Sequence, residues 1–167
     1  MKRICSRAFV GLVSIFLLAV QPTEAGPRAI DGKGWTAVLP AGWSMRRVDR
    51  ITTELWSADK TALCGIHVTK SAFKSSSELA AYLSNFTKRE LAKQGLSQVR
   101  LSYRKAKTKS GAQGYEELVD LRTGGRSKRL YFVVGKKAYA LDCETGTSFW
   151  KMHQPAFNQV LQSFDIK

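Results

Sequence analysis

Short stretches in which apolar and polar residues alternate recur through most of the chain. In residues 62–69, Cys64, Ile66 and Val68 share one side of an extended segment, because successive side chains of a strand point to opposite faces. Glycine, proline and serine bound most of these stretches, as they do between strands. The pattern predicts strands at residues 35–39, 43–48, 54–57, 62–69, 99–106, 114–121, 129–134 and 138–143.

Two other stretches have helical spacing. Ser75 followed by Glu78 fits a capping box, in which both side chains bond free amides at the start of a helix. Apolar residues then recur every three or four positions, and Gly95 suits the residue beyond the helix end, so we predict a helix over residues 77–94. A second helix is expected over residues 155–163, with Pro155 in its first turn.

The order of these elements predicts the fold class. A group of strands is followed by a helix, four further strands and a closing helix. The links between the last four strands are short and rich in turn residues, which favours an antiparallel meander. We therefore predict an α+β fold, with a central antiparallel sheet packed by two helices in an α/β/α sandwich.

The first 25 residues have the pattern of a signal peptide. Lys2, Arg3 and Arg7 precede an apolar run over residues 8–20, and small residues lead to a cleavage point after Ala25. The alternative is an uncleaved N-terminal anchor. We expect a signal peptide at 1–25, a flexible leader at 26–33 and one domain at 34–167. The mature chain, without a transmembrane segment, is then periplasmic or secreted.

Export changes how the cysteines are interpreted. Cys5 lies inside the signal, which leaves Cys64 and Cys143 in the mature chain. Two cysteines in an oxidising compartment favour one disulfide, Cys64–Cys143. The alternative is a pair of separate buried thiols, because free cysteine packs well in protein cores.

The chain is strongly basic. It has 27 Lys and Arg against 13 Asp and Glu, and without residues 1–25 its net charge is +12. Such a charge favours an acidic protein or an anionic envelope surface as partner, while export makes nucleic acid unsuitable as the main ligand. A predicted strand and the hairpin tip that follows it supply six candidates for one basic patch: Arg100, Arg104, Arg122, Arg126, Lys128 and Arg129.

Residues typical of catalysis are scarce. The two histidines and the cysteines lack the spacing of a metal site, and the sequence indicates neither a metal nor a cofactor. Glu116 and Asp120 share one face of a predicted strand and are the one candidate acid/base pair, as in an envelope hydrolase. The alternative is that both carboxylates pair with Arg and Lys on neighbouring strands. We expect no enzymatic activity.

The start of the predicted domain resembles that of PsbP-like domains. Those begin with a short strand, a Pro-x-Gly-Trp-type turn and a second strand, and residues 35–43 read WTAVLPAGW. The helix, the meander and the closing helix are similar in layout. The family includes photosystem II extrinsic proteins, a nuclear-import factor that binds a small GTPase, and bacterial envelope proteins. The resemblance implies a sheet sandwiched by helices, and function through protein contacts.

Three functions therefore remain open. The first is an exported, non-enzymatic binding or accessory protein that contacts a protein or the envelope surface through a basic face. The second is a periplasmic immunity or inhibitor protein that neutralises an acidic toxin. The third is an envelope hydrolase that uses Glu116 and Asp120.

Overall fold

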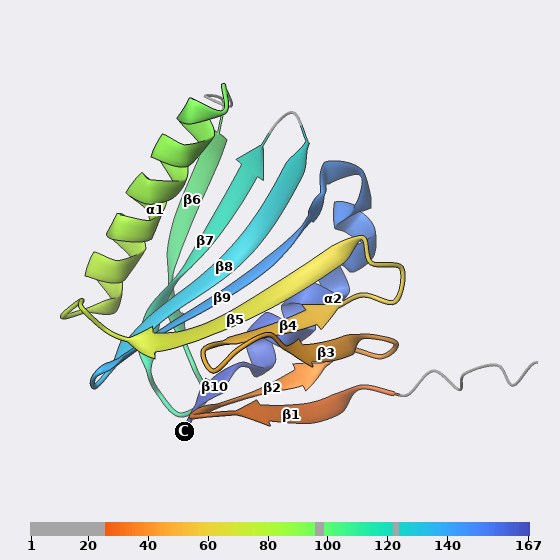
Figure 1. Ribbon diagram of the computed structural model, residues 1–167, viewed down its shortest axis with the longest axis horizontal. Helices are drawn as coiled ribbons and strands as arrows, with labels where there is room; N and C mark the ends of the chain where they lie inside the picture. The colour runs from red at the N-terminus through yellow and green to blue at the C-terminus, as the bar shows by residue number, and fades with distance from the viewer. Residues whose placement is uncertain (1–25, 96–98, 122–123) are drawn as a thin grey trace, which may run out of the picture.

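A seven-stranded antiparallel sheet forms the centre of the molecule, with one helix on each face (Figure 1). The computed structural model describes residues 26–95, 99–121 and 124–167. In spatial order the strands are β3 (Ser44–Arg47), β4 (Thr52–Trp56), β5 (Ala62–Lys70), β9 (Lys137–Gly146), β8 (Gly125–Val134), β7 (Gln113–Leu121) and β6 (Val99–Lys107). The helices are α1 (Ser76–Lys93) and α2 (Trp150–Ser163), the latter preceded by a 3-10 turn at Thr147–Phe149. The predicted fold class is confirmed.

A second, three-stranded sheet joins the two ends of the described chain. It consists of β1 (Arg28–Gly32), β2 (Trp35–Leu39) and β10 (Asp165–Ile166), with β2 in the middle. The prediction of a flexible leader over 26–33 is therefore wrong for β1, which pairs with β2 in a hairpin. Gly34 turns this hairpin with a φ of +90°, which glycine adopts without steric cost. The signal peptide predicted at 1–25 lies outside the described residues.

The helix ends follow local chemistry. Ser75 accepts the Glu78 amide at 3.2 Å, as predicted, while the Glu78 carboxylate accepts the Lys74 amide instead of that of Ser75. Gly95 has a φ of +75° just beyond α1, as expected there. The predicted start of α2 is wrong, because the helix begins at Trp150 and contains Pro155 in its interior.

The main core lies between the sheet and α2. Phe157 and Val160 of α2 are fully buried against it. Trp35 of the small sheet stacks on Phe164 at the end of α2, with 6.2 Å between ring centroids. A smaller cluster lies beneath α1 and includes Leu79 and Tyr131. The face under α1 is consequently the more polar one.

The predicted disulfide is present at the centre of the large sheet. Cys64 of β5 lies directly opposite Cys143 of β9, and the two are covalently joined. Both side chains are fully buried. The bond joins residues 79 positions apart and closes a segment that contains α1 and β6–β8.

We predict that replacing both cysteines by alanine lowers the free energy of unfolding by about 4 kcal/mol, because the unfolded chain is then no longer restricted. Urea denaturation of the double variant and of the oxidised wild-type protein measures this difference. Reduced wild-type protein serves as the control and should match the variant. Equal stability of the oxidised and reduced wild-type proteins would contradict the prediction.

Candidate functional site

The face of the large sheet beneath α1 carries two rows of side chains that run across the strands. Glu117 of β7 lies opposite Arg129 of β8, which lies opposite Asp142 of β9. We call these three residues the ionic row. The neighbouring row, which we call the pocket row, consists of Val119, Ser127, Glu144, Leu63 and Trp56.

Arg129 joins the two carboxylates of the ionic row. Its Nε lies 2.8 Å from Asp142 Oδ2, and its Nη1 lies 3.6 Å from Glu117 Oε2. Nη1 also donates a hydrogen bond of 2.9 Å to Thr87 Oγ1 of α1. The Arg129 side chain is 17% exposed and that of Glu117 is fully buried. Charges removed from water in this way are stable only where their partners replace the lost hydration.

Two tyrosines complete this network. Tyr131 donates to Glu117 Oε2 at 2.7 Å, and Tyr103 donates to Glu117 Oε1. Tyr103 is also hydrogen-bonded to Ser84 of α1. Burial raises the pKa of Tyr103 to about 12, and the hydrogen bond to Glu117 adds to that rise, so the hydroxyl keeps its proton at neutral pH. Because Ser84 and Thr87 both belong to α1, the network fastens this helix to the sheet.

Asp142 ends the ionic row in a less favourable environment. Burial raises the pKa of its carboxyl group from 3.8 to about 6, while Arg129 acts against that rise and Glu144 adds to it. Its Oδ1 is buried without a hydrogen-bond partner among the described residues, although the whole side chain keeps 29% exposure. The ionised form of Asp142 therefore reduces stability at neutral pH.

The sheet divides the predicted basic patch between its two faces. Lys128 donates to Asn158 of α2 at 3.1 Å, and the Arg126 guanidinium stacks over Trp150 of α2, 5.3 Å from its ring centroid. Arg129 lies on the opposite face, under α1. Residues 128 and 129 are adjacent in one strand, so their side chains cannot contribute to one surface.

Three residues of the predicted patch, Arg104, Arg126 and Lys128, also pair with carboxylates of β7. Arg104 lies 2.7 Å from Glu116, and Lys128 lies 3.5 Å from the same carboxylate. Arg126 lies 2.5 Å from Asp120. Glu116 and Asp120 thus pair with Arg and Lys across the sheet, which is the alternative role that the sequence left open for them. These ion pairs leave the patch with little free positive charge.

Two further patch residues cannot be placed on either face. Arg122 lies outside the described residues. Of Arg100 only the backbone is described, and it lies opposite Asp120. The described residues of the predicted patch therefore do not form one continuous basic surface.

Unpaired positive charge gathers instead on the turn between β3 and β4. Arg47 and Arg50 are exposed, and neither forms an ion pair with any residue that the structure describes. Met45, Val48 and Ile51 stand beside them with exposed fractions of 39%, 49% and 47%. We call these five residues the cationic hairpin. The sequence analysis missed it, although three arginines and three large apolar residues within seven positions gave a signal.

A groove separates the cationic hairpin from the β1–β2 turn. It has a volume of about 600 Å³, and its lining includes Lys33, Arg47, Arg50 and Ile51. Asp49 is the acidic residue of the lining. Its carboxylate accepts hydrogen bonds of 2.7 Å from the Ile51 and Thr52 amides, which hold the turn in shape. These hydrogen bonds also lower the pKa of the Asp49 carboxyl group. The groove therefore has a cationic rim over a partly apolar surface.

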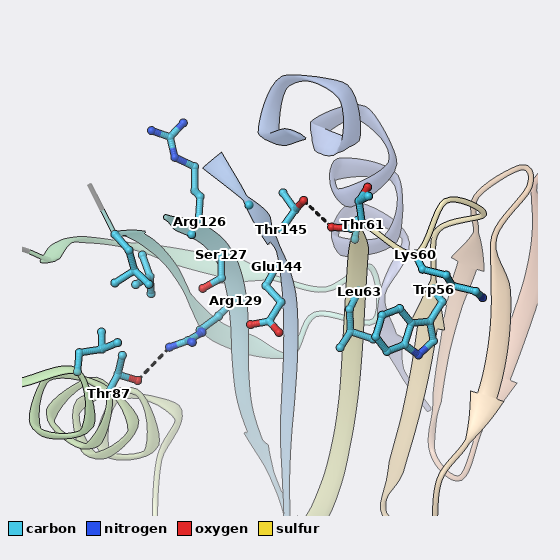
Figure 2. A pocket seen from close by; sticks show the side chains of 16 residues that line it. Trp56, Lys60, Thr61, Leu63, Thr87, Arg126, Ser127, Arg129, Glu144 and Thr145 are labelled. Atoms are coloured by element: carbon cyan, nitrogen blue, oxygen red, sulfur yellow. Dashed lines mark hydrogen bonds between the residues drawn. The ribbon is translucent and has the colours of Figure 1, made fainter. Parts of the chain in front are cut away.

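A separate pocket of about 340 Å³ lies over the pocket row, beside the C-terminal half of α1. Figure 2 shows Ser127, Glu144, Leu63 and Trp56 in succession across the strands, with Thr87 of α1 on one side. Leu91 and Leu121 add to its apolar lining. This pocket and the groove at the cationic hairpin have no lining residue in common.

The arrangement of strands and helices is similar to that of several solved structures. Cyanobacterial PsbP (CyanoP) from Synechocystis sp. PCC 6803 superposes with a TM-score of 0.64 at 17% identity, over 96% of this chain and 98% of its own. The chain has the PsbP-like fold. The Ran-binding protein Mog1p of Saccharomyces cerevisiae gives a TM-score of 0.57 at 9% identity, over 84% and 95%.

A third structure with this fold is PA94, a Pseudomonas aeruginosa protein of unknown function, with a TM-score of 0.50 and 14% identity over 86% of this chain and 99% of its own. No protein-family model and no curated protein matches the sequence. The likeness therefore concerns the PsbP-like fold alone. In the described part of the chain, no helix is long and apolar enough to cross a membrane, and no three His, Cys, Asp or Glu side chains gather as metal ligands.

We predict that Arg129→Met lowers the free energy of unfolding by about 3 kcal/mol, because it leaves two carboxylates without their buried partner. Arg104→Met is the matched control, since it also removes an arginine paired with a β7 glutamate, but one that is largely exposed. Arg104→Met should lower the free energy of unfolding by less than about 1 kcal/mol. Urea denaturation compares them, and equal losses would show that the ionic row has no special structural role.

The raised pKa of Asp142 predicts how stability depends on pH. The folded protein binds the proton of the Asp142 carboxyl group more tightly than the unfolded chain does. The stabilisation from this proton is therefore fully present below about pH 4 and is lost as pH rises through about 6. Relative to Asp142→Asn, the wild-type protein should gain up to about 3 kcal/mol between pH 7 and pH 4. Denaturation of both proteins across this range measures the gain, and parallel profiles would refute the prediction.

Proposed function

We propose that this chain is an exported, non-catalytic binding protein that contacts an acidic protein through the cationic hairpin. The observation that carries the proposal is the combination of unpaired guanidinium groups with exposed apolar side chains on one turn. Isolated exposed apolar residues are common on protein surfaces, whereas a contiguous group rimmed by polar residues is typical of interaction sites.

Charge complementarity favours an acidic partner. Arg104, Arg126 and Arg129 of the predicted patch are paired with carboxylates, but Arg47, Arg50 and Lys33 face solvent without a carboxylate partner among the described residues. Unpaired charges at the rim of an interface accelerate association with a partner of opposite charge. The apolar side chains Val48 and Ile51 then supply area that becomes buried on contact.

The position of β3 favours a protein over a lipid surface. β3 is the end strand of the large sheet, and all four of its residues are exposed. An end strand presents backbone donors and acceptors that an extended segment of a partner protein can pair with. A lipid headgroup offers charge but no matching ladder of peptide groups.

Two further observations support the proposal. The Ran-binding protein Mog1p shares the fold, so this arrangement of strands and helices is compatible with recognition of another protein. The buried disulfide is suited to an oxidising compartment outside the cytosol. An immunity or inhibitor protein acting on an acidic toxin is a special case of the same proposal, and a neighbouring toxin gene would favour it.

We predict that Arg47→Glu/Arg50→Glu weakens binding of the physiological partner at least tenfold, because both unpaired cations become repulsive. Crosslinking in intact cells, purification and mass spectrometry identify the partner, and its affinity for the purified proteins is then measured. The matched control is Lys107→Glu/Lys109→Glu, which reverses two exposed lysines at the opposite edge of the sheet.

The control variant should retain wild-type affinity and both variants should unfold at the same urea concentration as the wild-type protein. Equal binding by the hairpin variant and the wild-type protein would exclude the cationic hairpin as the contact. Recovery of only lipid or polysaccharide, released by modest salt, would replace the protein partner by an anionic envelope surface.

A further inference from the structure

The pocket of Figure 2 contains one carboxylate, that of Glu144, and its lining also includes Lys60, Arg126 and Arg129. Glu144 lies on its floor with an exposed side chain and forms no ion pair with the described residues. Glu117 and Asp142 lie in the adjacent ionic row, where Arg129 is their shared cation. Three carboxylates therefore face one guanidinium in this part of the sheet.

The other cations near the pocket are directed elsewhere. The Arg126 guanidinium is bound to Asp120 and stacks on Trp150, on the α2 face of the sheet. Lys60 Nζ donates to Ser44 Oγ at 3.2 Å, and Figure 2 shows its side chain turned away from Glu144. α1 contributes Thr87 and Leu91 to the lining, neither of which carries charge.

A buried hydroxyl group independently indicates a ligand. Ser127 is 5% exposed and lines the pocket, and its Oγ has no hydrogen-bond partner among the described residues. A buried hydroxyl without a partner is costly, so a donor or acceptor arriving in the pocket gains by pairing with it. Ser127 lies directly opposite Glu144 in the sheet, which places this hydroxyl beside the free carboxylate.

Apolar side chains extend the pocket away from these two polar groups. Leu63 is the next member of the pocket row after Glu144, and Trp56 follows Leu63. Strands lie about 4.8 Å apart, so Trp56 is about 10 Å from Glu144 along the row. That length matches a cationic head group at Glu144 with an apolar stem lying over Leu63 and Trp56.

We propose that this pocket binds a guanidinium or ammonium group carried on an apolar stem, with Glu144 and Ser127 as the partners of the cation. The same chemistry is offered by an Arg or Lys side chain of a peptide and by a small free amine. The inference is independent of the proposed function, because it concerns other residues and a ligand of opposite charge.

The experiment uses two probes, butylguanidinium and a capped pentapeptide with one central Arg between glycines. NMR shifts of the Ser127 and Glu144 amides and of the Trp56 indole N–H report binding to the oxidised protein. The neutral counterparts are butanol and the same peptide with citrulline. The variants are Glu144→Gln and Ser127→Ala, and Glu90→Gln on α1 is the matched control for loss of a carboxylate.

We expect at least one cationic probe to shift these signals, its neutral counterpart to bind at least tenfold more weakly, and Glu144→Gln to reduce affinity about tenfold or more. Ser127→Ala should reduce affinity less, and Glu90→Gln should not change it. Binding of the peptide alone identifies a protein side chain as the ligand, whereas binding of both probes admits a small amine. Equal affinity for charged and neutral probes, unchanged affinity in Glu144→Gln, or no shift with either cation overturns the proposal.

Discussion

The guanidinium of Arg129 is the interaction on which the arrangement of α1 depends. It bridges Glu117 and Asp142 across three strands and also reaches Thr87 on the helix above them. The apolar cluster beneath α1 is small, so polar contacts hold a large share of this interface. Buried ionic networks of this kind favour one arrangement of their members, because a shift leaves a charge without its partner.

Ion pairs across the strands also explain why a basic composition does not give an evenly basic surface. The acidic residues of β7 pair with Arg and Lys of β6 and β8, so several basic side chains of these strands are neutralised within the sheet. Positive charge remains where the local sequence has few acids, as on the turn after β3. Surface charge is thus decided by strand register as much as by the numbers of Lys and Arg.

Much of the fold could be predicted from the sequence, because apolar residues recur at every second position in a half-buried strand and at every third or fourth position in a helix. Residues 62–69 and the Ser75 cap were assigned correctly, since their signals are local. The β1 strand was missed because residues 26–33 contain little apolar periodicity, and its partner β2 supplies the pairing. Residues 128 and 129 point to opposite faces because side chains alternate along a strand, and this follows from the sequence. The carboxylates that pair with them lie on neighbouring strands, and only the register of the folded sheet shows which ones they are.

The three-stranded sheet has a consequence for the order in which the chain folds during synthesis. Its middle strand β2 pairs with β10, and the Val38 amide is bonded to Ser163 Oγ, 125 positions away. The β1–β2 hairpin therefore leaves the ribosome long before its third strand. Since two isolated strands are only marginally stable in water, this part of the molecule becomes ordered last, when α2 and β10 have emerged.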